Sequence, residues 1–150
     1  MSQLRLEELS AATIVAVNSL GLKPGQEQFV SPVSYAAAAA VTPPHTAWQR
    51  VVLEDERVVG FIHGNFDPDA HLEEFRAALW RINVDADAQG RGVGTFAVRA
   101  LIEEAKRRDV KRLTVLWERG EDSPEEFFLF VGFKPVGETP YGEVIGAIDL

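Results

Sequence analysis

Three glycines at alternate positions form the run Gln89-Gly90-Arg91-Gly92-Val93-Gly94, which follows a β-rich segment and precedes an amphipathic one. Glycine lets the backbone approach a ligand closely, and the first N–H groups of a helix have no partner within that helix. The helix dipole adds about half a positive charge at this end. The run therefore predicts a site for an anion such as a phosphate, to which Arg91 could add a bidentate contact. A plain glycine-rich turn is the alternative interpretation.

Two other phosphate-binding motifs fit this run less well. A P-loop needs Lys followed by Ser or Thr after its last glycine, and here that glycine is followed directly by Thr95. The run Gly92-Val93-Gly94-Thr95-Phe96-Ala97 matches the dinucleotide pattern G-x-G-x-x-A, and Glu118 follows at the distance of a ribose-binding acid. However, Gly90 comes too late for a tight turn, and only 32 residues follow Glu118, too few for the remaining parallel units. Dinucleotide binding is therefore kept as a further hypothesis for the ligand of this run.

The elements that position this run belong to a chain of 150 residues, which predicts a single domain over residues 1–150. The chain has no cysteine, which excludes disulfides and thiol nucleophiles, and its apolar runs are far too short to span a membrane. Its first residues lack the layout of a secretory signal, so we expect a cytoplasmic protein. The net charge of −8 argues against nucleic acid as a partner and favours cationic small molecules, although acidity can also serve solubility alone.

Hydrophobic periodicity predicts an alternation of strands and helices. We expect strands at residues 4–6, 48–53, 57–64, 77–84 and 112–117, and one or two more within 133–150. Helices are expected from Ser10 to Gly21, from Ser31 to Pro43, from Thr95 through Ala105, and from Ser123 to Gly132. Strands come first in a hairpin and then on either side of a helix. This order predicts an α/β fold of the mixed, α+β kind, with six to seven mostly antiparallel strands and about four helices.

Strict alternation along two of the strands predicts which side chains share a face. Within residues 57–64, it puts His63 on one face with Val59 and Phe61. Within residues 77–84, it puts Leu79 on the face of Arg81 and Asn83, and the residues between them on the other face.

The motif Gln89-x-x-Gly92-x-Gly94 resembles the Q/R-x-x-G-x-G/A signature of the GNAT superfamily of acetyl-CoA-dependent N-acetyltransferases. Leu79-Trp80-Arg81-Ile82 is similar to the strand before this motif in bacterial acetyltransferases of polyamines and small amines. The stretch from Gly120 to Phe133, with Phe127-Phe128, resembles their next block, and Gly142-Glu143-Val144 resembles a closing strand. The similarity follows the order of elements along the whole chain and is specific from Leu79 onward.

The resemblance implies a fold with a splayed central strand pair and acetyl-CoA in the gap, as co-substrate and without a metal. The N–H groups of Gln89 to Thr95 would hold the pyrophosphate of the coenzyme. The backbone of Ile82, Asn83 and Val84 would pair with the pantetheine arm like an added strand. Phe127 and Phe128 would complete the cofactor site.

Acetyl transfer to an amine needs a base, an oxyanion site and a proton for the departing thiolate. Family members usually donate that proton from a tyrosine, whose position here is Phe128. Three explanations stay open. The thiolate leaves unprotonated or takes its proton from water, another residue such as Tyr141 or Tyr35 donates the proton, or the protein has lost its catalytic activity. The alternative interpretations are that Tyr141 is a surface aromatic residue and that Tyr35 packs in the core, so that neither donates a proton.

Two side chains are candidates for the base. His63 titrates near neutrality, with a half-buried histidine bonded to backbone as the alternative. Glu118 would point into the splayed gap and act as base or amine anchor, with a solvated strand end as the alternative.

The leading hypothesis is therefore transfer of an acetyl group from acetyl-CoA to a small primary amine by direct attack in a ternary complex, and a polyamine is the first acceptor we expect. A catalytically silent CoA-binding or regulatory module is the alternative, because of Phe128. Family members are often homodimers, and the hydrophobic closing strand Val144–Leu150 could pair across subunits, with an ordinary edge strand as the alternative.

Overall fold

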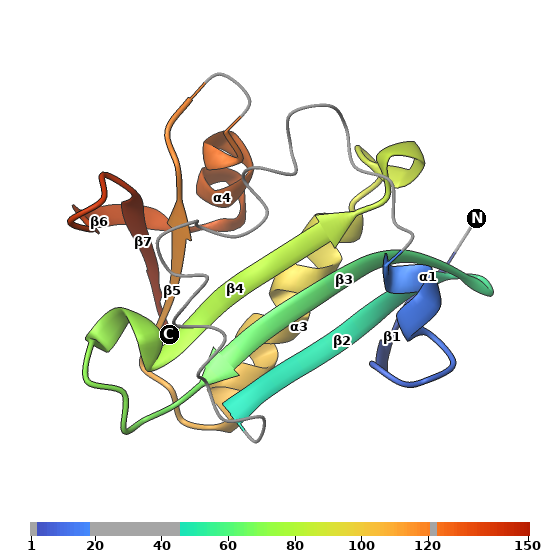
Figure 1. Cartoon of the computed structure of the whole chain (residues 1–150), viewed down its shortest axis with the longest axis horizontal. Coiled ribbons are helices and arrows are strands. Elements are labelled where there is room, and N and C mark those ends of the chain that lie inside the picture. Colours follow the sequence, from blue (N-terminus) through green and yellow to red (C-terminus); the bar gives the residue numbers. More distant parts are fainter. Residues whose placement is uncertain (1–2, 19–45, 121–122) are drawn as a thin grey trace.

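The computed structural model of the chain describes residues 3–18, 46–120 and 123–150. These residues form a seven-stranded sheet in the order β1-β2-β3-β4-β5-β7-β6 (Figure 1). The strands are β1 (Leu4–Glu8), β2 (Ala47–Glu54), β3 (Arg57–Phe66), β4 (Ala77–Val84), β5 (Arg112–Trp117), β6 (Lys134–Glu138) and β7 (Val144–Asp149). The helices are α1 (Ile14–Asn18), α3 (Val93–Arg107) and α4 (Glu125–Val131), with 3-10 turns η4 (Glu73–Phe75) and η5 (Ala86–Ala88).

All neighbouring strands in the sheet are antiparallel except β4 and β5, which are parallel. This arrangement confirms the predicted mixed α/β fold with mostly antiparallel strands. Three of the expected α-helices lie among the described residues, and the one expected from Ser31 to Pro43 lies outside them.

The two parallel strands are joined over a short stretch only. Their register comprises just two pairs, Ala78 with Thr114 and Leu79 with Val115. Beyond these pairs β4 and β5 diverge toward their carboxyl ends (Figure 1). This confirms the predicted splayed pair, and it leaves the edge of β4 that faces β5 without a strand partner from Trp80 to Val84.

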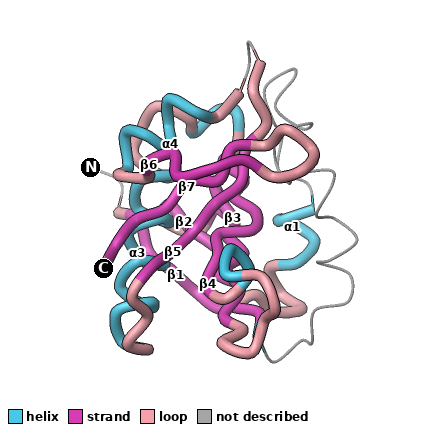
Figure 2. Tube along the Cα trace, turned by 90° about the vertical axis from the view of Figure 1, so that its left-hand side faces the viewer, coloured by secondary structure: helices cyan, strands magenta, loops and turns pink. Residues whose placement is uncertain are grey.

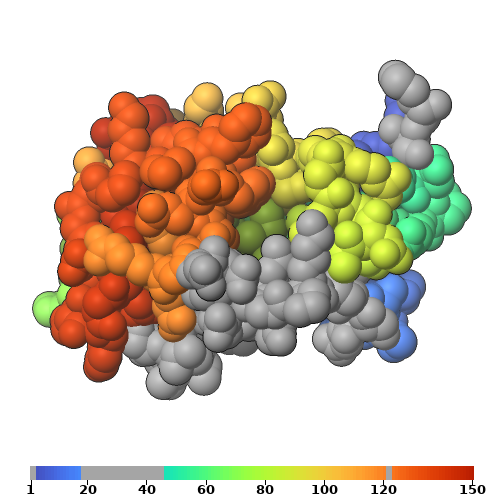
Figure 3. Space-filling view, turned by 90° about the horizontal axis from the view of Figure 1, so that it is seen from above, coloured from blue at the N-terminus to red at the C-terminus, as the bar shows by residue number. Residues whose placement is uncertain are grey.

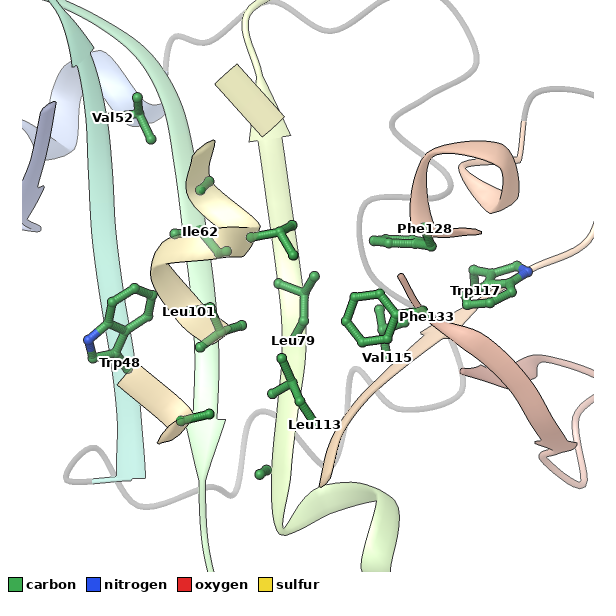
Figure 4. Close-up of a cluster of buried hydrophobic side chains, with 14 of the residues drawn as sticks. Trp48, Val52, Ile62, Leu79, Leu101, Leu113, Val115, Trp117, Phe128 and Phe133 are labelled. Atoms are coloured by element: carbon green, nitrogen blue, oxygen red, sulfur yellow. The ribbon is translucent and has the colours of Figure 1, made fainter. Parts of the chain in front are cut away.

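Helices cover both faces of the sheet. Figure 2 shows α3 on one side of the strands and α1 on the other. The main core lies between the sheet and the helices α3 and α4, and Figure 4 shows its largest side chains. Leu101 of α3 is fully buried there, so its truncation to alanine would cost roughly 2–5 kcal/mol. A smaller cluster of Val51, Leu53 and Phe61 packs with Val17 of α1 on the opposite face.

A β-bulge changes which residues of β3 share a face. The register between β2 and β3 shifts between Val52 and Leu53, which leaves Val59 as an extra residue. Val59 lies in the main core, whereas Phe61 lies in the smaller cluster on the other face. His63 stays on the face of Phe61, two residues away. The prediction that Val59 shares this face is therefore wrong, because a bulge reverses the alternation.

A second bulge affects β4. The register with β3 shifts next to His63, which leaves Trp80 as an extra residue. Leu79 consequently lies in the main core, where Ile82 and Val84 also pack. The predicted alternation, which put Leu79 on the opposite face from Ile82 and Val84, is wrong for the same reason.

The last strand is not at an edge of the sheet. β7 lies between β5 and β6, so the prediction that Val144–Leu150 offers an edge for pairing across subunits is wrong. The edge strand on this side of the sheet is β6, whose five residues are all exposed. Lys134 and Pro135 in this strand are residues that discourage pairing with another edge. A homodimer itself stays a prediction.

Candidate active site

A cavity of about 880 Å³ opens where β4 and β5 diverge, between the start of α3 and α4. Figure 3 shows the recess between the segment that carries α4 and the segment that leads into α3. Its volume is in the range of sites that bind a cofactor-sized ligand. The cavity is lined by Leu4, Ile82, Val84, Gln89, Gly90, Gly92, Val93, Gly94, Thr95, Phe96, Arg99, Ser123, Pro124, Phe127, Phe128 and Phe130.

The loop before α3 has the geometry of an anion site. Gly92 is the N-cap of α3 with φ 85°, in the left-handed region that glycine adopts without strain. The first intrahelical bond of α3 runs from the N–H of Phe96 to the carbonyl of Gly92, so the preceding N–H groups have no partner within the helix. A Cβ on Gly92 would meet no atom within 4 Å, which shows that this backbone borders open space. The exposed N–H groups and the helix dipole together favour an anionic ligand.

Two hydrogen bonds fix this loop to the sheet. The side chain of Gln89 donates from Nε2 to the carbonyl oxygen of Val84 at 3.0 Å, which closes the connection between β4 and α3. The N–H of Asp85 donates to the carbonyl oxygen of Val59 at 2.9 Å. The connection between β4 and α3 is therefore attached to both β3 and β4.

Position 94 has no room for a side chain, because the ring of Phe127 packs against the backbone there. A Cβ at this position would lie 2.9 Å from Cζ of Phe127 and 3.7 Å from Cγ2 of Val84. The ring of Phe127, on α4, therefore packs directly on the first turn of α3. This contact sets the width of the cavity between the two helices.

The lining of the cavity differs from the rest of the molecule in charge. The chain carries 23 acidic residues and a net charge of −8, yet none of the described residues that line the cavity is a carboxylate. Among these described lining residues, Arg99 is the one with a charge. Arg91, which the sequence predicted as a phosphate contact, instead pairs with Glu54 of β2 at 2.9 Å and is not part of the lining. Among the described lining residues, an anion in the cavity would thus meet N–H groups and one guanidinium.

The free edge of β4 borders this cavity. Ile82 and Val84 contribute side chains to the lining, and both pack against the main core. Asn83 is 7% exposed, and its Oδ1 atom has no hydrogen-bond partner in the part of the chain that the structure describes. Its side chain points away from the cavity, on the other face of the strand.

Two carboxylates lie together at the far end of β5. Trp117 pairs with Val144 of β7, and both side chains lie in the main core. Glu118 and Glu143 are their neighbours along the chain and leave the sheet on the opposite face. Burial raises the pKa of the Glu143 carboxyl; the hydrogen bond from Thr139 opposes the shift, and the negative charge of Glu118 adds to it.

His63 lies on that same face of the sheet, on β3. Burial lowers the pKa of its imidazole, and the positive charge of Arg81, its pairing partner on β4, adds to this effect. Its Nε2 atom is buried and has no hydrogen-bond partner among the described residues. The ring lies 5.7 Å from that of Trp80, between centroids. At neutral pH His63 is therefore an uncharged imidazole that can accept a proton.

Phe128, at the position where relatives carry a tyrosine, is part of the core. Its ring stacks on Trp117 with 5.5 Å between centroids and contacts Phe133 edge-on at 5.9 Å. The side chain is 4% exposed and still lines the cavity. Tyr141, the candidate replacement, is 72% exposed in the β6–β7 connection. Tyr35 lies outside the described residues.

Of the twelve residues predicted to bind the cofactor, ten line the cavity, and Asn83 and Arg91 do not. Glu118, His63 and Tyr141 also lie outside the lining. Sequence reasoning missed Leu4, Phe96, Arg99, Ser123, Pro124 and Phe130. Helical spacing could have found Phe96 and Arg99, because both follow the glycine loop on one face of α3. Nothing in the sequence connects Leu4 of β1 to this cavity.

Within the described residues, no group of three or more His, Asp or Glu side chains is arranged to hold a metal ion. Among the same residues no helix has the length and apolarity needed to cross a membrane.

Several solved structures that resemble this chain are those of acetyltransferases. The ribosomal-protein-S18-alanine N-acetyltransferase of Escherichia coli is 18% identical, with a TM-score of 0.68, and the match covers 98% of this chain and 94% of that one. The PaiA N-acetyltransferase of Thermoplasma acidophilum, solved in complex with coenzyme A, is 11% identical, with a TM-score of 0.70 and 99% of each chain covered. An aminoglycoside 6'-N-acetyltransferase, also complexed with coenzyme A, is 16% identical, with a TM-score of 0.68 and coverage of 97% and 96%.

At these identities the structural likeness shows the fold alone. No protein of curated function matches the chain in sequence. The model of the acetyltransferase (GNAT) family, however, matches residues 22–133, which include β2 to α4 and the whole glycine loop. The chain therefore belongs to the acetyltransferase (GNAT) family.

Proposed function

We propose that this protein transfers an acetyl group from acetyl-CoA to a small primary amine, in a ternary complex of both substrates with the enzyme. The observation that carries the proposal is the cavity at the start of α3, where N–H groups without a partner in the helix meet described lining residues that include no carboxylate. These features fit the diphosphate of coenzyme A. Two relatives of the same fold were solved with coenzyme A bound, which supports this choice of ligand.

In the proposed complex the N–H groups between Gln89 and Thr95 bind the diphosphate. The pantetheine arm follows the free edge of β4 from Ile82 to Val84, where no strand competes for the backbone hydrogen bonds. Phe127 and Phe128 enclose the arm from the side of α4. The thioester then reaches the point where β4 and β5 separate, within reach of both faces of the sheet.

The reaction itself exchanges one bond for another. The nitrogen of a neutral amine attacks the thioester carbonyl, a C–N bond forms, the C–S bond breaks, and the thiolate leaves and takes up a proton. An alkylamine is almost fully protonated at neutral pH, so a base must first remove one proton. Glu118 and the neutral imidazole of His63 are the proposed candidates, because both lie outside the lining that the coenzyme would occupy. A backbone N–H near Asn83 would stabilise the oxyanion by about 3 kcal/mol.

The residue expected to protonate the departing thiolate is a tyrosine, and this chain has Phe128 at that position. A thiol with an ordinary pKa of about 8.5 is a tolerable leaving group, so protonation by water suffices for a working enzyme. Tyr141 is the proposed alternative donor, since its exposed ring lies in the connection that also carries Glu143. The buried Phe128 supports a second candidate function, a module that binds coenzyme A without catalysis.

For the acceptor we propose an amine with more than one positive charge, such as a polyamine. The net charge of −8 concentrates cations near the surface, and Glu118 with Glu143 brings two carboxylates to the end of β5. A monoamine would use one of these carboxylates, whereas a polyamine would use both.

The proposal is tested by following free thiol while the protein is mixed with acetyl-CoA and a panel of monoamines and polyamines. We expect thiol release with at least one amine, a preference for polyamines, and a loss of kcat of about 100-fold in Glu118→Gln. Glu138→Gln is the control, because Glu138 is exposed and pairs with Arg119 at the surface. Binding of coenzyme A with no thiol release from any amine would favour the silent module. In that case, a gain of turnover in Phe128→Tyr would identify a lapsed enzyme.

A further inference from the structure

Arg99 occupies a distinct position in the cavity. It lies six residues after Val93, the first residue of α3, which corresponds to about 9 Å along the helix axis. Thr95 and Phe96, four and three residues earlier, line the cavity on the same face of the helix. Side chains on a helix lean toward its N-terminus, so the guanidinium of Arg99 extends back toward the glycine loop.

The guanidinium of Arg99 is available for a ligand. Among the described residues it takes part in no ion pair and no hydrogen bond. Glu103, the acid four residues further along α3, pairs with Lys106 instead. Arg107 and Arg108 both bind Glu104, which leaves Arg99 as the basic side chain of α3 that faces the cavity without a carboxylate partner.

Coenzyme A carries two separate anionic groups, the diphosphate and a phosphate on its ribose. The N–H groups at the start of α3 account for the first group, and Arg99 is the charged side chain that the described part of the lining offers for the second. Guanidinium groups bind phosphate oxygens through two parallel N–H donors, which suits a terminal phosphate. A hydrophobic ligand of the same size would offer this arginine no anionic group to bind.

We propose that Arg99 binds the ribose phosphate of coenzyme A and makes the protein discriminate coenzyme A from dephospho-coenzyme A, which lacks this phosphate. The inference rests on the proposed function, because it assumes that the cavity binds coenzyme A. It adds a residue that determines cofactor specificity and that the glycine motif does not contain.

The test is a double comparison by titration calorimetry, with coenzyme A and dephospho-coenzyme A titrated into the wild type and into Arg99→Gln. We expect the wild type to prefer coenzyme A by about 10-fold, as one charge-assisted contact at a half-open site would give. Arg99→Gln should bind both ligands equally, with the affinity that the wild type has for dephospho-coenzyme A. The preference of the wild type should shrink as the salt concentration rises.

Arg107→Gln is the matched control, since it removes the same charge from the same helix outside the cavity. It should keep the full preference for coenzyme A. Equal affinities of the wild type for both ligands, or an unchanged preference in Arg99→Gln, would overturn the role of Arg99 and leave the proposed function standing. If the wild type bound neither ligand, the proposed function would fail and this inference with it.

Discussion

Replacing Gly92 by leucine should abolish binding of coenzyme A while the fold survives. Gly92 has φ 85° and a Cβ there would meet nothing within 4 Å, so the leucine side chain would project into the open cavity without a clash. The cost to the fold is then the left-handed backbone alone, about 1–2 kcal/mol. For a chain of this size that cost corresponds to a decrease in Tm of roughly 2–8 °C.

The effect on binding should be much larger than the effect on stability. The diphosphate needs the space next to the N–H groups of Val93 and Gly94, which the leucine would occupy. The loss of two charge-assisted hydrogen bonds corresponds to about 3–6 kcal/mol. Affinity for coenzyme A should therefore fall by more than about 100-fold.

Gly142→Leu provides a matched control for this variant. Gly142 has φ 86°, and a Cβ there would also meet nothing within 4 Å, but it lies in the β6–β7 connection outside the cavity. Thermal unfolding should show a similar decrease in Tm for both variants, and titration with coenzyme A should show a loss of affinity for Gly92→Leu alone. Wild-type affinity in Gly92→Leu, or an equal loss in both variants, would refute the placement of the diphosphate at this loop.

Three further predictions concern other residues. In Gly94→Ala the new methyl group would lie 2.9 Å from the ring of Phe127, so the ring should turn into the cavity and weaken coenzyme A binding; the double variant with Phe127→Leu should recover part of the affinity in the same titration. Because the pKa of His63 is lowered in the native state, the unfolded state binds more protons below about pH 6.5, and the free energy of unfolding should fall as the pH decreases through that range. The free energy of unfolding, measured with urea from pH 5 to 7.5, should change less with pH in His63→Gln than in the wild type. An equal dependence on pH in both proteins would contradict the lowered pKa of His63. Because the pKa of Glu143 is raised, the native state keeps its proton longer, and stability is lost as the pH rises above the ordinary value for glutamate. Glu143→Gln should therefore gain stability relative to the wild type between pH 4 and pH 7, and a constant difference in urea midpoint would argue against burial of the charge.

The elements of the fold follow from patterns within single segments. The spacing of Val98, Leu101 and Ala105 predicts α3, and all three side chains are buried in the main core. Their burial explains why this helix could be predicted from periodicity. The order of strands and helices likewise predicts the mixed sheet, because a hairpin requires antiparallel neighbours and a crossing helix allows a parallel pair.

The faces of the strands and the edges of the sheet could not be predicted in the same way. Val59 and Trp80 are extra residues at bulges, and each reverses the alternation for the residues on one side of it. A bulge depends on how two strands pair, which a pattern within one strand does not contain. The position of β7 between β5 and β6 is also set by pairing between segments, and an apolar strand alone does not show whether it is central.

The candidate site also contains parts that a local pattern predicts and parts that depend on distant segments. The glycine loop is local in sequence, so its position at the start of α3 could be predicted from residues 89–94. The ion pair of Arg91 with Glu54 depends on the distant strand β2, and no local pattern indicates it. Arg99 lies within the predicted helix, but its place in the cavity lining depends on how α3 packs against β4 and α4, which the helix sequence alone does not contain.

A crystal structure of the protein with coenzyme A bound tests the central claim most directly. We predict diphosphate oxygens within about 3.2 Å of at least two backbone nitrogens between Gln89 and Thr95, and a pantetheine arm along the free edge of β4. Coenzyme A bound at another place, or a glycine loop that makes no contact with its phosphates, would contradict the account.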